Sequence, residues 1–78
     1  MNVSPVYEII DFLAAGTTPD SIVAFRPSVA AQRRVEDLIY REKTSSLTSE
    51  ETDELNYYMQ LEHIMRLAKA RARRHIKP

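Results

Sequence analysis

The chain has 78 residues and a mass of 9.0 kDa, which leaves room for one small domain over residues 1–78. With 44% apolar and 28% charged residues and a formal net charge of zero, its composition is typical neither of a disordered chain nor of a membrane span. The absence of cysteine excludes disulfides, thiolate zinc sites and cysteine nucleophiles. No basic start precedes an apolar run, so we expect no signal peptide and a cytoplasmic location.

The first two predicted helices share a start signal, which is a good N-cap residue followed by a proline. In Ser4-Pro5 this signal precedes apolar residues at helical spacing, and Gly16 offers a left-handed stop after them. Thr18-Pro19 opens a shorter segment, because Pro27 disfavours helical geometry at the residue before it. The pattern predicts helices over about 5–15 and 19–25.

Two further helices follow from caps at Ser28 and Thr48. Residues 48–51 form a capping box, in which Thr48 accepts a hydrogen bond from the Glu51 amide and Glu51 reaches back to the Thr48 amide. No glycine or proline then interrupts the chain until Pro78. We therefore predict helices over about 29–43 and 49–75, no strand, and an all-α fold of three short helices plus one long C-terminal helix.

The long predicted helix has apolar residues about every 3.5 positions, as in a coiled-coil seam. At about 27 residues it would be close to 40 Å long, which is too long for three short helices to cover completely. An uncovered seam needs a neighbour, so we expect self-association as a homodimer, or a stable complex with a cognate protein. The seam positions are Tyr57/Tyr58, Leu61, Ile64/Met65, Ala68 and Ala72.

The zero net charge hides a division along the chain. Residues 1–65 hold five basic and eleven acidic residues, whereas the basic C-terminal end, residues 66–78, holds six basic residues and no acidic one. Such a division bears on partners more than on fold. The basic end is open to three interpretations, namely contact with nucleic acid, contact with a protein, or solvation, because cations at a helix C-terminus also stabilise the helix dipole.

No set of side chains has the spacing of a catalytic or metal site. His63 and His75 are twelve residues apart, and neither has a ligand partner at the spacing of a helical metal site. The acidic residues at the start of the long helix are the type that the helix dipole favours there: Glu50, Glu51, Asp53 and Glu54. We therefore expect no enzyme, no metal or cofactor, and no small-molecule substrate.

The sequence favours a non-enzymatic protein-binding module whose long helix docks on another protein. An apolar helical face that enters a groove, flanked by arginines, is the expected mechanism. The predicted partner-binding residues are three apolar anchors and three arginines: Tyr58, Leu61, Met65, Arg66, Arg71 and Arg73.

The alternative is a small DNA- or RNA-binding regulator. Residues 13–38 partly fit a helix-turn-helix pattern, with Gly16 in the turn, although Phe12 stands where that motif normally needs a small residue. A short helix hairpin without DNA contact fits the same residues. The basic side chains that would contact nucleic acid are Arg33, Arg34, Arg71, Arg73 and Arg74.

Three stretches carry a resemblance to a known family: IIDFLAAGTTPDSIVAFRPS (9–28), RVEDLIYREK (34–43) and LTSEETDELNYYMQLEHIMRLAKARAR (47–73). Through them the chain resembles a family of short, largely uncharacterised helical proteins of bacteria, mainly cyanobacteria. The resemblance implies an antitoxin-like or accessory partner that restrains a nuclease or toxin, often encoded beside endonucleases of the His-Asn-His class. Residues 13–38 are also similar to a short helix-turn-helix domain of antitoxin-like proteins, with matches at Leu13, Ala15, Gly16, Pro19, Val23, Pro27 and Val35.

Overall fold

The computed structural model describes residues 4–76, and all of the regular secondary structure in that range is helical. The four helices are α1 (Pro5–Ala14), α2 (Pro19–Ala24), α3 (Val29–Thr44) and α4 (Ser49–His75). The predicted all-α fold with one long C-terminal helix is confirmed, and every predicted boundary lies within one residue of the observed one. The last two positions of the basic segment 66–78 lie outside the described residues.

The predicted caps are present at the starts of the helices. The hydroxyls of Ser4 and Ser28 accept hydrogen bonds from the amide three residues further on, at 3.2 and 3.1 Å. At α4 the Thr48 hydroxyl accepts from the Glu51 amide and the Glu51 carboxylate accepts from the Thr48 amide, both at 3.1 Å. Gly16, at a φ of 91°, turns the chain between α1 and α2. Local sequence therefore determines where each helix begins.

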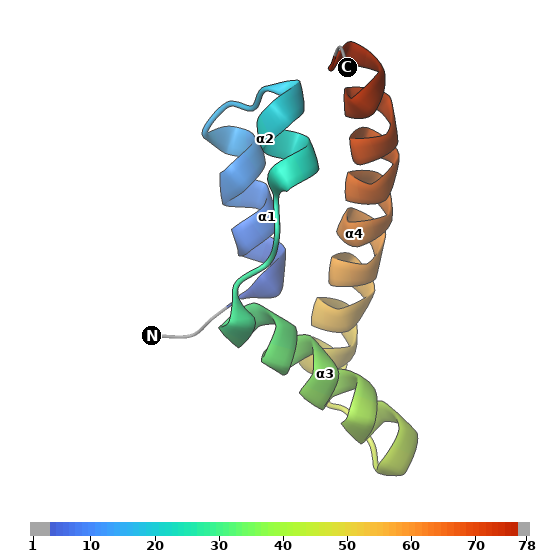
Figure 1. The fold of residues 1–78 in the computed structure, drawn as a ribbon. Coiled ribbons are helices and arrows are strands. Elements are labelled where there is room, and N and C mark those ends of the chain that lie inside the picture. Colours follow the sequence, from blue (N-terminus) through green and yellow to red (C-terminus); the bar gives the residue numbers. More distant parts are fainter. Residues whose placement is uncertain (1–3, 77–78) are drawn as a thin grey trace.

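All three short helices pack against α4 (Figure 1). α1 and α2 lie along one side of it, whereas α3 contacts its N-terminal part and then points away (Figure 1). The core forms where the helices meet, from Ile9 of α1, Leu38 of α3, and Leu55, Tyr58 and Met65 of α4. α4 is thus the common support of the fold.

One face of α4 is covered along most of its length. Its buried positions run from Leu55 to Ala72, and each of these two is 4% exposed. The short helices were not expected to cover α4 completely, but on this face they cover it as far as Ala72, because α2 reaches the C-terminal half of α4. Phe25, the residue after α2, packs on Phe12 with the rings tilted and their centroids 4.4 Å apart, and its backbone carbonyl accepts a hydrogen bond from Lys69 Nζ at 2.9 Å. What the fold leaves uncovered is a second face of α4, not one end.

Candidate protein-binding surface

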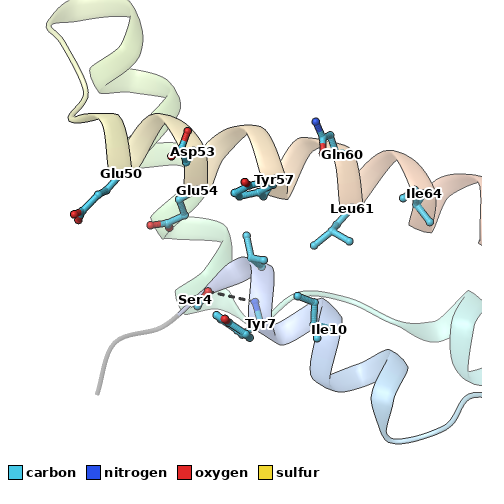
Figure 2. A pocket seen from close by; sticks show the side chains of 11 residues that line it. Ser4, Tyr7, Ile10, Glu50, Asp53, Glu54, Tyr57, Gln60, Leu61 and Ile64 are labelled. Carbon is cyan, nitrogen blue, oxygen red and sulfur yellow. Dashed lines mark hydrogen bonds between the residues drawn. The ribbon is translucent and has the colours of Figure 1, made fainter.

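An open groove with a volume of about 590 Å³ lies between α1 and α4. One wall is a side of α1 and the other is a face of α4, and apolar side chains of both helices border the space between them (Figure 2). We call it the α1–α4 groove, and its lining residues are Ser4, Val6, Tyr7, Ile10, Glu50, Asp53, Glu54, Tyr57, Gln60, Leu61 and Ile64.

The apolar side chains of the α1–α4 groove are far more exposed than those of the core. Tyr7 is 63% exposed, Tyr57 58%, Ile64 53% and Ile10 39%. Single apolar residues on a surface are common, but these four meet in one groove. A concentration of apolar surface such as this one is typical of a site that binds another protein.

Carboxylates occupy the end of the groove where α4 begins (Figure 2). Glu54 accepts two hydrogen bonds from Arg34 of α3, each 3.0 Å long, so its charge is partly compensated. Glu50 and Asp53 are exposed, and no ion pair within residues 4–76 involves either of them. This end of the groove therefore presents negative charge.

A second arginine also holds α3 against the start of α4. Arg41 pairs with Glu51 of α4 and, at 3.0 Å, with Asp37 of its own helix. The hydrogen bond from Arg41, followed by that from the Thr48 amide, lowers the pKa of Glu51 from 4.5 to about 2. These contacts fix the acidic end of the groove relative to α3.

Two of the three predicted apolar anchors belong to the chain's own core. Tyr58 is 9% exposed and Met65 is 4% exposed, and burial raises the pKa of Tyr58. They are not accessible to a partner, so the interpretation of them as docking anchors is corrected. Both residues are apolar in each of the pairs Tyr57-Tyr58 and Ile64-Met65. The second residue of each pair packs against the short helices and the first stays exposed. Leu61 is half-buried and lines the groove.

The three predicted partner-binding arginines all lie in the C-terminal half of α4. Arg66 pairs with Glu62, one turn earlier, at 2.8 Å. Arg71, Arg73 and Arg74 are exposed, and the ion pairs formed among residues 4–76 include none of these three. The C-terminal half of α4 therefore presents positive charge, at the opposite end from the carboxylates.

The residues of the nucleic-acid alternative do not form one surface. Arg33 and Arg34 lie on α3, which packs at the N-terminal part of α4, and Arg34 is already bound to Glu54. The other three lie near the C-terminal end of α4, at the far end of the molecule (Figure 1). The arginines of this hypothesis therefore separate into two groups, of which the C-terminal one holds Arg71, Arg73 and Arg74.

Other kinds of site have little support in the described part of the chain. Across residues 4–76 no three histidine or carboxylate side chains gather closely enough to hold a metal ion, and His63 and His75 are exposed. None of the helices in the same range has both the length and the apolar character needed to cross a membrane.

Sequence reasoning missed the contribution of α1 to the groove. The helical spacing of the apolar residues after Ser4-Pro5 did not separate those that face the core from those that stay exposed: Ile9 is buried, whereas Ile10 and Leu13 are 39% and 40% exposed. The exposed Tyr7 was not expected to take part at all. Tyr7 lines the groove because α1 lies beside α4, and the sequence alone does not show which helices are neighbours.

Comparison of the chain with protein-family models, with curated proteins and with solved structures finds no match. The resemblance of residues 9–28, 34–43 and 47–73 to a bacterial family therefore stays a prediction.

Proposed function

We propose that this chain is a non-enzymatic protein-binding module that receives an amphipathic helix in the α1–α4 groove. The observation that supports the proposal most strongly is the set of exposed apolar side chains that face the groove from both walls. An amphipathic helix buries its apolar face in a hydrophobic groove through anchors one turn apart. Tyr57, Leu61 and Ile64 are spaced at four and three residues, so they form one continuous apolar wall on which the anchors of such a helix could pack.

The overall shape also supports a binding role. The radius of gyration is 14.1 Å, whereas a compact domain of this length has about 11.5 Å. An elongated chain has more surface for its volume and less core to stabilise it. Added apolar contacts from a second polypeptide would stabilise such a chain as well as bind it.

A narrower biological role is part of the proposal. The chain would act as an antitoxin-like or accessory protein that restrains a nuclease or toxin by docking on it. This role draws on the sequence resemblance.

Capture of the partner by purified variants tests the proposed function. Ile64→Lys places a charge in the groove, whereas Met59→Lys places one on a different side of α4, where Met59 is 44% exposed. We expect wild type and Met59→Lys to recover the same stoichiometric protein from cells of the natural host, and Ile64→Lys to lose it at least about tenfold. Equal recovery by all three, or no stoichiometric partner, would contradict the proposal.

A nucleic-acid role is the second candidate, favoured by the exposed Arg71, Arg73 and Arg74. Replacing all three by alanine should weaken retardation of duplex DNA at low salt, and the wild-type affinity should fall steeply as salt rises. Retardation that is absent at low salt, or that is unchanged in the variant, would exclude this candidate.

A further inference from the structure

One face of α4 has side chains at alternating spacings of four and three residues from Glu50 to His75. This alternation defines a heptad repeat, the pattern by which two helices pack as a coiled coil. We call it the heptad face, and none of its residues is among the buried ones. Its centre is apolar and consists of Tyr57, Leu61, Ile64 and Ala68.

The two ends of the heptad face carry opposite charge. Glu50 and Glu54 precede the apolar centre, and Arg71 follows it. Beside the face, Asp53 adds a negative charge to the first end and Arg74 adds a positive charge to the second. A face that is acidic, apolar and basic in this order is complementary to itself when one of two copies is reversed.

We propose that the helix in the α1–α4 groove is α4 of a second copy of this chain, packed antiparallel through the heptad face. This proposal rests on the proposed function for the identity of the surface. In an antiparallel coiled coil the heptad positions of the two helices meet in layers. The central layer places Leu61 opposite the partner's Ile64, and the next layer places Tyr57 opposite the partner's Ala68.

The same register pairs the charges. It places Asp53 beside the partner's Arg74, and it places the partner's Arg71 beside Glu54, which also pairs with Arg34 of its own chain. The two-fold axis repeats each pair on the other side, so four acid–base contacts flank the apolar centre. A parallel pair would instead set Glu54 beside the partner's Glu54 and Arg71 beside the partner's Arg71. Charge therefore selects the antiparallel register, while the apolar layers supply most of the affinity.

The chain exposes more surface than a compact monomer of its mass. The accessible surface of the chain is 5922 Å², whereas a compact monomer of 9.0 kDa has about 4,900 Å². The excess of about 1,000 Å² is spread over the whole elongated chain, and a standard interface buries roughly 800 Å² of each partner. The second helix would also cover Tyr7 and Ile10 on the other wall of the groove.

Sedimentation equilibrium tests whether the dimer forms. We expect a mass of about 18 kDa, twice the 9.0 kDa of the chain, at micromolar concentration. Ile64→Glu should raise the dissociation constant by about a hundredfold or more, because the change occurs twice in the central layers. Met59→Glu is the matched control and should leave the dissociation constant within about threefold of wild type, since Met59 lies outside the heptad face.

Disulfide trapping tests the register, and the absence of native cysteine makes each introduced thiol unambiguous. A mixture of Tyr57→Cys and Ala68→Cys chains should form a mixed disulfide under mild oxidation. Tyr57→Cys alone should form little, because the two Tyr57 positions of the antiparallel pair lie roughly 16 Å apart along the helix axis. Rapid crosslinking of Tyr57→Cys to itself would overturn the register.

A charge exchange tests the acid–base contacts at the pair that has no ion-pair partner within the described part of the chain. Arg74→Glu and Asp53→Lys should each weaken self-association about threefold or more, and a 1:1 mixture of the two should recover it. Circular dichroism of each variant confirms that its helices remain. Two variants that associate as tightly alone as wild type would overturn the proposed pairing.

The outcomes also separate this proposal from the proposed function. A wild-type chain that stays at 9.0 kDa, yet loses its cognate protein on Ile64→Lys, would overturn the dimer and leave the binding function intact. Two results together would support the dimer and contradict binding of another protein in the groove. They are formation of the antiparallel disulfide and binding of the cognate protein that Ile64→Lys does not weaken.

Discussion

Two faces of α4 have similar sequences and opposite environments. Met65 is 4% exposed within the core, whereas Ile64, its neighbour in the chain, is 53% exposed in the α1–α4 groove. Both residues are large and apolar, so hydrophobicity does not distinguish them. The difference lies in which side of α4 the short helices cover. A helix that is apolar on two faces can pack one face against its own fold, and the other face then remains available to a second chain.

Substitution of the two neighbouring residues should give the largest contrast. Met65→Ala removes buried side-chain volume and should lower the free energy of unfolding by about 2–5 kcal/mol. Ile64→Ala should change it by less than about 0.5 kcal/mol, because the side chain is half in solvent. Chemical denaturation at concentrations where the chain is monomeric measures both. Equal losses in the free energy of unfolding would contradict the claim that one face of α4 is buried and the other exposed.

Removal of the N-cap of α4 should lower the free energy of unfolding by an intermediate amount. The cap stabilises the helix as a whole and so supports both of its faces. Thr48→Ala deletes the hydroxyl that accepts from the Glu51 amide, at a cost of about 1 kcal/mol in the free energy of unfolding. Thr48→Ser keeps the acceptor and should recover most of the loss. The same denaturation experiment measures both variants, and a Thr48→Ala chain as stable as wild type would show that the capping box contributes nothing.

The smallest effect is expected from the titration of Glu51. Its folded-state pKa lies near 2 and its ordinary value is 4.5, so the stability that it contributes is fully present above pH 4.5. That contribution should be lost as the pH falls from 4.5 towards 2. Thermal unfolding of wild type and Glu51→Gln across this range measures it: the gap between them should narrow on acidification. A gap that widens would contradict the ion pair with Arg41.

The helices were predictable because their signals are local. Ser4, Ser28 and Thr48 each satisfy an amide only three residues away, so a short stretch of sequence contains both the donor and the acceptor. The α4 capping box is the clearest case, since both of its hydrogen bonds were expected and both are present.

The candidate surface was less predictable because it depends on contacts between distant residues. The sequence placed apolar residues at both Tyr57 and Tyr58, and spacing alone did not decide which one faces the core. The packing of α2 on α4 joins residues far apart in the chain, as in the hydrogen bond from Lys69 to the Phe25 carbonyl, 44 residues away. The predicted anchors were therefore partly those of the core, and the wall that α1 supplies to the groove was missed.

The central claim is that another polypeptide covers the heptad face of α4, and isotope-filtered NOE spectroscopy measures such contact directly. A 1:1 mixture of labelled and unlabelled chains reports only protons that are close together in different copies. We predict cross-peaks between the methyl groups of Leu61 in one copy and of Ile64 in the other. A spectrum without intermolecular cross-peaks from these two residues, at concentrations where the chain stays folded, would contradict the antiparallel dimer.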